Sequence, residues 1–285
     1  MAKIIDGKQI SQEIKEELKS KVEEFKNKYN RQITLAVILV GENPASQVYV
    51  KNKIKATEYV GMKSLAYYLP ETATEQEVSE TVLSLAKDDS VDGILVQLPL
   101  PKHLDENKIL NLIPASKDVD GFLPENVGNL LLGQPCTIAC TPFGVIKMIE
   151  NQKIETSGKN AVVIGRSNIV GKPMALLLLQ KNCTVSICHS KTKNLKEICK
   201  NADIIVAAIG RAKFVTADMV KEGAVVIDVG INRTENGLVG DVDFDAVKDI
   251  ASYITPVPGG VGPMTIAMLL YNTYLCALRK ENELR

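Results

Sequence analysis

One lysine of the sequence lies where an amphipathic helix should be apolar. A helix is expected over residues 43–61, which open with Asn43 and Pro44, a capping residue followed by a proline suited to the first turn. Tyr49 and Lys53, four residues apart, share one side of this helix. The opposite, polar face carries four side chains: Gln47, Lys51, Lys55 and Glu58.

The position of Lys53 has two interpretations. A lysine on an apolar face can extend its charged end past its neighbours into solvent. Alternatively, Tyr49 and Lys53 project together into a site, where partial burial would lower the pKa of the lysine and allow proton exchange near neutral pH. The second interpretation makes Lys53 a candidate for acid–base catalysis.

Further polar side chains could join such a site. Gln97 lies near the end of a buried strand expected over residues 91–101, in the region where α/β sheets gather ligand-contacting residues. Asp118 and Asp120 lie in a loop marked by Gly121. The alternatives are a hydrogen-bonded core amide for Gln97 and a turn cap for Asp118.

A second kind of site is indicated by a glycine turn. A strand expected over residues 160–165 ends at Gly165-Arg166-Ser167, and an apolar helix follows Gly171. A strand, a tight turn and a helix N-terminus can bring backbone N–H groups to a pyrophosphate. The pattern departs from GxGxxG because Ser167 occupies the second glycine position, so a tight turn of some other α/β protein remains an alternative.

The next strand favours NADP over NAD. An NAD site has an Asp or Glu there for the ribose 2′-hydroxyl, whereas this strand ends in His189-Ser190-Lys191. Arg166, Ser190, Lys191 and His189 are suitable donors for a 2′-phosphate. The alternative for His189 is an ordinary solvated loop residue.

Composition argues against several other functions. The 34 basic and 34 acidic residues cancel, so neither nucleic acid nor an anionic membrane surface is an expected partner. No signal peptide and no run of about 18 apolar residues is visible, so a cytoplasmic location is expected. Six cysteines without a CxxC pair and only two histidines argue against a disulfide framework or a metal site.

The order of expected elements predicts an α/β fold with two domains. Helices are expected over residues 7–30 and from residue 74, with a buried strand over 34–41 between them. A loop-rich junction over 112–142 precedes a Rossmann-like series of strands. These strands and the last helix are expected at 160–165, 183–188, 202–210, 224–230 and 263–280.

Seven motifs together resemble one enzyme family. They are Tyr49-Val-Lys-Asn-Lys53, the stretch 91–101 containing Gln97, Lys117-Asp-Val-Asp120-Gly, Cys140-Thr-Pro-Phe-Gly, the stretch 165–173, His189-Ser-Lys-Thr and the stretch 256–265. In this order they closely resemble the bifunctional methylenetetrahydrofolate dehydrogenase/methenyltetrahydrofolate cyclohydrolase (FolD) family. The resemblance runs from the first helix to the last.

The resemblance implies a homodimer of two-domain protomers that binds tetrahydrofolate derivatives in a cleft between the domains. Residues 1–122 would form the catalytic folate-binding domain, with helix 263–285 packed back on it, and residues 123–262 the Rossmann-like NADP-binding domain. The enzyme would oxidise 5,10-methylenetetrahydrofolate with NADP and hydrolyse the methenyl product to 10-formyltetrahydrofolate. These reactions belong to one-carbon metabolism and purine biosynthesis.

The resemblance also implies roles for individual residues. Lys53 would be the essential lysine, Tyr49 its stacking and proton-network partner, Gln97 the amide that orients it, and Asp120 the carboxylate that binds the pterin. The cofactor would contact Gly165, Arg166, Ser167, Ser190 and Ile231. The folate side of the cleft would add Val96, Leu98, Pro258, Gly259, Gly260, Val261 and Gly262.

Two other functions remain as alternatives. One is another two-domain NADP dehydrogenase, such as the shikimate dehydrogenase type, whose catalytic lysine also lies in the N-terminal domain. The other is a module that senses NADP without turnover, although such a module needs no pair like Tyr49 and Lys53. Addition of methylenetetrahydrofolate or shikimate in the presence of NADP distinguishes the two dehydrogenases.

Overall fold

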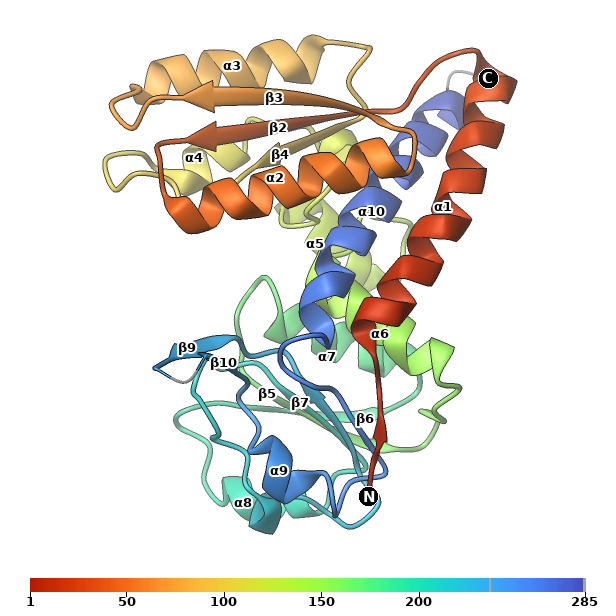
Figure 1. Ribbon diagram of the computed structural model, residues 1–285, viewed down its shortest axis with the longest axis vertical. Helices are drawn as coiled ribbons and strands as arrows, with labels where there is room; N and C mark the ends of the chain where they lie inside the picture. The colour runs from red at the N-terminus through yellow and green to blue at the C-terminus, as the bar shows by residue number, and fades with distance from the viewer. Residues whose placement is uncertain (236, 284–285) are drawn as a thin grey trace. The chain divides into compact units, whose positions relative to one another are not determined.

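The computed structural model describes residues 1–235 and 237–283 (Figure 1). The chain forms two compact units, neither of which is one continuous stretch of sequence. The first unit combines Met1–Gln12 with Ala139–Met268, and the second combines Glu13–Ile138 with the chain from Leu269 onward. Two long helices, α1 (Gly7–Tyr29) and α10 (Val261–Glu283), contribute residues to both units.

The second unit contains a parallel three-stranded sheet. Its strands β2 (Thr34–Val40), β3 (Lys63–Leu69) and β4 (Gly93–Val96) lie in the order β3-β2-β4. The central strand β2 is buried along its whole length, as is usual for a parallel strand covered on both faces. The strands expected at 34–41 and within 91–101 are thereby confirmed. The sequence pattern does not predict β3, because this edge strand is largely exposed and lacks a continuous apolar run.

Helices cover both faces of this sheet (Figure 1). On one face, α3 (Glu75–Lys87) packs Val78 and Val82 into a buried cluster with Ile38 of β2. The helix expected from residue 74 begins with a capping box, in which the Thr74 hydroxyl accepts from the Glu77 N–H and the Glu77 carboxylate accepts from the Thr74 N–H. On the other face, α2 (Pro44–Tyr59) begins at the predicted cap, whose side chain accepts two backbone N–H groups.

The loop that follows β4 contains short helices that the sequence pattern does not predict. After α4 (Glu106–Leu110) and the 3-10 turn η1 (Ala115–Lys117), α5 spans Pro124–Leu132 inside the stretch expected to be loops. Pro124 stands in its first turn, and Gly133 ends it with a left-handed φ of 68°. Proline and glycine here mark the two ends of a helix rather than an irregular segment.

The first unit contains a parallel six-stranded sheet in the order β1-β11-β8-β7-β5-β6. Its strands are β1 (Lys3–Ile4), β5 (Asn160–Ile164), β6 (Thr184–Cys188), β7 (Ile204–Ala207), β8 (Val225–Asp228) and β11 (Tyr253–Ile254). The four expected Rossmann-like strands are therefore confirmed. The chain passes from β5 outward to β6 and then returns to β7 on the other side of β5, which creates a topological switch point.

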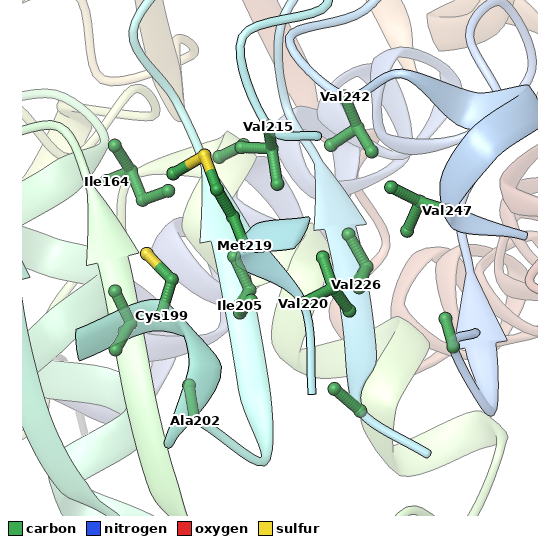
Figure 2. Close-up of a cluster of buried hydrophobic side chains, with 14 of the residues drawn as sticks. Ile164, Cys199, Ala202, Ile205, Val215, Met219, Val220, Val226, Val242 and Val247 are labelled. Atoms are coloured by element: carbon green, nitrogen blue, oxygen red, sulfur yellow. The ribbon is translucent and has the colours of Figure 1, made fainter. Parts of the chain in front are cut away.

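Two groups of elements pack on this sheet. α6 (Cys140–Asn151) packs against α7 (Gly171–Gln180), which contacts β5 and β6. The other face is covered by α8 (Leu195–Lys200), the turn η2 (Ala217–Met219) and α9 (Phe244–Val247). Figure 2 shows this second core, where Ile164, Ile205 and Val226 of three strands meet Cys199 of α8 and Val247 of α9. A small hairpin, β9 (Asn232–Thr234) and β10 (Gly237–Val239), completes the unit.

All six cysteines are free and buried. Burial raises the pKa of the Cys199 thiol to about 12, so this sulfur behaves as a small apolar core group.

Helix α10 is long and apolar enough, by length and composition alone, to cross a membrane between Val261 and Asn282. However, 56% of its most apolar stretch is buried inside the structure. The fully buried Asn272 donates hydrogen bonds to the carbonyls of Val119 and Ile138, 2.9 and 2.8 Å away. A core helix passes the same test, so this result is weak support for a membrane span.

Candidate active site

Lys53 is held by Gln97 within the second unit. Its Nζ donates to Oε1 of Gln97 at 2.9 Å. The Gln97 amide nitrogen donates to the carbonyl of Leu98 at 2.7 Å, which turns the amide oxygen toward the lysine. The backbone N–H of Gln97 donates to Ile38 of β2, so the end of the central strand fixes this pair. The structure therefore brings two predicted site residues into direct contact.

Helix α2 presents Lys53 beside its buried face. The fully buried residues of α2 are Ser46, Val50 and Thr57, and Lys53 is half-buried next to them. Tyr49, one turn earlier, is 50% exposed. The alternative in which the charged end of Lys53 simply reaches solvent does not match its hydrogen bond to Gln97, the residue directly after β4. Tyr49 remains accessible to stack on a ligand ring.

Asp118 and Asp120 have different surroundings, although they are two residues apart. Asp118 is 3% exposed and accepts from the N–H groups of Gly121 and Leu123 and from the side-chain amide of Asn126. It therefore organises the loop, as its alternative interpretation predicted. Asp120 is only half-buried.

Asp120 has an unusual proton affinity for an aspartate. Burial raises its pKa to about 6, and the negative charge of Asp118 acts in the same direction. The positive charge of Lys53 opposes this shift. An acid that titrates near pH 6 close to a lysine is the kind of group found at functional sites.

Lys117 is a residue of this loop for which the sequence predicts no role. It is 8% exposed, and its Nζ donates to the carbonyls of Leu85, Ala86 and Asp88 at 2.7–3.1 Å. These carbonyls lie at the C-terminus of α3, where a cation is favoured. Burial lowers the pKa of Lys117. Lys117 thus anchors the loop that carries Asp120, and its position directly before Asp118 was the available signal.

The two remaining predicted residues of this unit lie on either side of Gln97. Val96 is 1% exposed and its side chain belongs to the core, so only its main chain is available to a ligand. Leu98 is half-buried and supplies the carbonyl that orients Gln97.

In the first unit, the turn after β5 requires glycine at two positions. Gly165 has a φ of 128°, and a Cβ there would lie 2.2 Å from the carbonyl oxygen of Ala208. A Cβ on Gly171 would lie 2.3 Å from the carbonyl oxygen of Gly165. The Ser167 hydroxyl accepts from the N–H groups of Val170 and Gly171 at 3.2 and 3.3 Å. Ser167 therefore closes the turn in place of the second glycine of the dinucleotide fingerprint.

A pocket of about 540 Å³ opens at the carboxyl ends of β5, β6 and β7, at the switch point. Gly165, Arg166, Ser167, His189 and Ser190 line it, so four of the five predicted cofactor residues meet here. Lys191 is not among the described residues that line the pocket, and its backbone N–H donates to the His189 ring at 3.2 Å.

The pocket has the donor set that NADP needs. None of the described residues that line it is acidic, whereas a site for an unphosphorylated ribose normally supplies a carboxylate. Two arginines, a histidine and three hydroxyls face the pocket instead, namely Arg166, Arg211, His189, Ser167, Ser190 and Thr192. Sequence reasoning missed Arg211 as well as Thr192. The available signal was position, since Thr192 follows the parallel strand β6 and Arg211 follows the buried parallel strand β7.

The fifth predicted cofactor residue, Ile231, lines a different pocket. This pocket measures about 150 Å³ and is bounded by Ile231, Leu238 and the segment 256–263. The predicted folate residues Pro258, Gly259, Gly260, Val261 and Gly262 all belong to its lining. Ile231 is 51% exposed, so an apolar side chain is available there to a ligand.

Comparisons with known proteins match both units. A family model described as tetrahydrofolate dehydrogenase/cyclohydrolase, catalytic domain, matches residues 5–120. A second, described as tetrahydrofolate dehydrogenase/cyclohydrolase, NAD(P)-binding domain, matches residues 139–281.

Individual relatives match over nearly the whole chain. The bifunctional protein FolD of Agathobacter rectalis is 59% identical over 273 residues, which cover 95% of this chain and 98% of the relative. The crystal structure of the bifunctional enzyme FolD from Campylobacter jejuni is 54% identical with a TM-score of 0.95, and the match covers 98% of this chain and 100% of that one.

A more distant relative carries a ligand. The methylenetetrahydrofolate dehydrogenase-cyclohydrolase of Trypanosoma brucei, solved with NADP cofactor and inhibitor, is 37% identical with a TM-score of 0.92, and 98% of each chain is covered. The agreement of two domain models and of near full-length relatives shows that the chain belongs to the tetrahydrofolate dehydrogenase/cyclohydrolase (FolD) family.

Proposed function

We infer that this protein is a bifunctional enzyme of one-carbon folate metabolism. It oxidises 5,10-methylenetetrahydrofolate to 5,10-methenyltetrahydrofolate with NADP, and it hydrolyses the methenyl compound to 10-formyltetrahydrofolate. The observation that carries this conclusion is the contact between Lys53 and Gln97 in a chain of the FolD family. Neither an NADP sensor nor a shikimate-type enzyme is supported by the family match.

NADP, when bound, supplies the hydride acceptor. We propose that Gly165, Arg166, Ser167 and Ser190 hold its phosphates and ribose at the 540 Å³ pocket, and that Ile231 contacts it from the smaller pocket. The glycine turn suits this role because its backbone can approach a pyrophosphate without a Cβ in the way.

We propose that Lys53 moves the proton that hydrolysis requires. Attack of water on the methenyl carbon gives an adduct, and opening of this adduct requires a proton at one ring nitrogen. An amine held by a single hydrogen bond to an amide oxygen keeps further donor directions free for a ligand. Gln97 is its positioning residue, and Tyr49 is accessible to stack on the substrate.

We propose that Asp120 recognises the pterin through hydrogen bonds to ring N–H and amino groups. Its incomplete burial and the separate anchoring of the loop by Asp118 and Lys117 support this role. Val96, Leu98 and the segment 258–262 would complete the folate contacts. In this proposal residues 1–122 and the last helix, 263–285, form the folate-binding domain, and residues 123–262 form the NADP-binding domain.

We further propose a cytoplasmic homodimer whose 10-formyl product serves purine biosynthesis. Six free, buried cysteines fit a reducing compartment. β6 is the outer strand of the six-stranded sheet and carries Ile187, which is 42% exposed, so this edge suits pairing with a second copy. Sedimentation of wild type and Ile187→Lys tests the dimer, because a charge on this edge should shift the protein toward monomer.

One coupled assay tests the two activities. NADPH formation and loss of the methenyl compound are followed in the same sample after methylenetetrahydrofolate is added, with shikimate in a parallel sample. The proposal requires NADPH formation with the folate alone, followed by decay of the methenyl compound faster than in buffer. Reduction of NADP with shikimate, or no reduction with either substrate, would overturn it.

A further inference from the structure

The turn after β7 forms a side of the nucleotide pocket that the predicted cofactor residues do not include. This turn lines the pocket with Ala208, Ile209 and Arg211, in addition to the turns that contain Gly165 and Ser190. Arg211 is exposed, and the carbon at the centre of its guanidinium lies 4.8 Å from the ring centre of Phe214, which also lines the pocket. An arginine that stacks on a ring has fewer orientations to lose when it binds a ligand.

The charge of the pocket matches a dianionic phosphate group. Arg166 and Arg211 both line it, and the described lining residues include no acid that would neutralise either one. Arg166 follows β5 and Arg211 follows β7, so the two arginines come from the two strands that flank the switch point. A planar guanidinium can donate two parallel hydrogen bonds to a phosphate, which a lysine ammonium cannot do in the same way.

A buried carboxylate fixes the backbone of this turn. Asp241 is 0% exposed and accepts from three consecutive N–H groups, those of Ile209, Gly210 and Arg211, at 2.7, 2.9 and 2.8 Å. The side-chain amide of Asn232 donates to the same carboxylate at 2.9 Å. These three hydrogen bonds to one carboxylate restrain the backbone of the turn, and the last of them is donated by Arg211 itself.

Asp241 is fixed in turn by a second buried carboxylate. Its N–H donates to Asp228 at 2.9 Å, and Asp228 also accepts from Gly230 and Val242. A Cβ on Gly230 would lie 2.1 Å from Asp241, and a Cβ on Gly240 would lie 1.8 Å from Asp228. Because Gly230 and Gly240 have no side chains, Asp241 and Asp228 can lie close to the backbone at these two positions. An ordinary surface turn needs no such arrangement.

We propose that Arg211 is a specificity-determining residue that binds the ribose 2′-phosphate of NADP together with Arg166, and that Asp241 is its positioning residue. The proposal rests on the proposed use of NADP. It deepens that function by assigning the turn after β7 to the phosphate that distinguishes NADP from NAD.

Three variants of the full-length protein test Arg211. Arg211→Ala should lower kcat/KM for NADP at least tenfold and change kcat/KM for NAD less than twofold. Arg211→Lys should fall between wild type and Arg211→Ala, because it keeps the charge but not the paired donors. Lys213→Asn is the matched control, since it removes one positive charge two residues away and outside the described pocket lining, at a left-handed φ of 52° that asparagine tolerates.

Nucleotide fragments separate the 2′-phosphate from the rest of the cofactor. Adenosine 2′-phosphate should inhibit wild type competitively with NADP, and Arg211→Ala should weaken this inhibition at least tenfold. Inhibition by adenosine 5′-phosphate should change less than twofold. Equal losses for both fragments, or for NADP and NAD, would assign Arg211 to the adenine or pyrophosphate and overturn the proposal. An unchanged NADP preference would overturn it as well.

The role of Asp241 is tested by Asp241→Asn, which replaces one acceptor oxygen by a donor facing backbone N–H groups. We expect a higher KM for NADP, a reduced preference over NAD and an unchanged hydrolysis of the methenyl compound. In an Arg211→Ala background the same change should have little further effect on the preference. If Asp241→Asn does not fold, Asn232→Ala removes one contact to the carboxylate and should reduce the preference more weakly. A full preference in the variants that fold contradicts the positioning role.

These outcomes are distinguishable from failure of the proposed function. A wild type that reduces NAD as well as NADP, or neither nucleotide, removes the proposed cofactor itself. A wild type that prefers NADP, combined with an Arg211→Ala variant that keeps this preference, removes only the inference.

Discussion

The site around Lys53 depends on side chains, whereas the site around Gly165 depends on the main chain. Around Lys53 the decisive contacts join side chains, and one hydrogen bond of 2.9 Å links a residue of α2 to the residue directly after β4. Around Gly165 the decisive features are main-chain approaches that leave no room for a Cβ. Replacement of one side chain should therefore abolish catalysis at the first site and leave its backbone unchanged. In the second site an added methyl group should displace the backbone itself.

The largest effect is expected at Lys53. Lys53→Met should reduce hydrolysis of the methenyl compound by more than about a thousandfold, because no other group then supplies the proton transfer and its positioning. The variant should remain folded and bind NADP as wild type does, as measured by fluorescence titration. Hydrolysis near the wild-type rate would show that the lysine assignment is wrong.

A strong effect on the other site is expected from Gly165→Ala. The new methyl group would meet the Ala208 carbonyl at 2.2 Å, so the ends of β5 and β7 must move apart. Weaker NADP binding by about a hundredfold is expected, whereas hydrolysis of the methenyl compound should be largely kept. Gly158→Ala is the control, because Gly158 also has a positive φ, of 72°, but nothing lies within 4 Å of its added Cβ. Equal behaviour of the two variants would mean that the close approach is unimportant.

A smaller effect is expected where side chains contribute to the nucleotide site. Arg166→Ala combined with Ser190→Ala removes a charged and a neutral hydrogen bond, and a charged one contributes about 1.5–3 kcal/mol. The preference for NADP over NAD should fall at least about tenfold, mainly through KM for NADP. Measurement of kcat/KM for both nucleotides decides the point. A double variant that keeps its full preference would contradict the assignment.

The last effect concerns the stability of the fold, and not catalysis, and it depends on Asp120. Its pKa of about 6 in the folded protein lies above the ordinary value of 3.8, so the folded state binds more protons than the unfolded state between these values. Stability from this group is therefore present at low pH and lost as pH rises toward 6. Asp120→Asn should gain stability relative to wild type over this range, by at most about 3 kcal/mol at 1.36 kcal/mol per pKa unit.

Thermal unfolding at several pH values measures this effect. The melting temperature of the variant minus that of wild type should increase from pH 4 to pH 7 and then level off. Asp228, whose pKa burial also raises to about 6, is present in both proteins and cancels in the difference. A constant difference across this range would show that Asp120 titrates like an exposed aspartate.

The sequence predicted the buried strands and capped helices because their signals are local. The strands β2, β5, β7 and β8 are mostly apolar and buried, and the start of α3 is marked by Thr74 and Glu77. The edge strand β3 lacks such a run, and α5 was hidden because Pro124 and Gly133 also mark loops. β3 forms because it pairs with β2, and α5 is recognised only from the positions of its proline and glycine at the two ends of a helix. Neither signal is visible in single residues.

The sites show the same limit. Lys53 stood out because its side of the helix is wrong for a charge, and Gly165 because it follows a strand. Arg211, by contrast, is an ordinary exposed residue in sequence terms, and only the return of the chain to β7 brings it to the pocket. The separate roles of Asp118 and Asp120 also require the fold, since three donors surround one of them and Lys53 lies near the other.

The pairing of β1 with β11 has a consequence for synthesis of the chain. Lys3 and Ile4 are synthesised long before their partners, Tyr253 and Ile254. β1 therefore cannot pair until residue 254 has been made, and contacts of such long sequence separation form slowly. Until then β8, which pairs with β11 in the finished sheet, has no partner on that side. We expect nascent chains that end before residue 253 to remain protease-sensitive at their N-terminus.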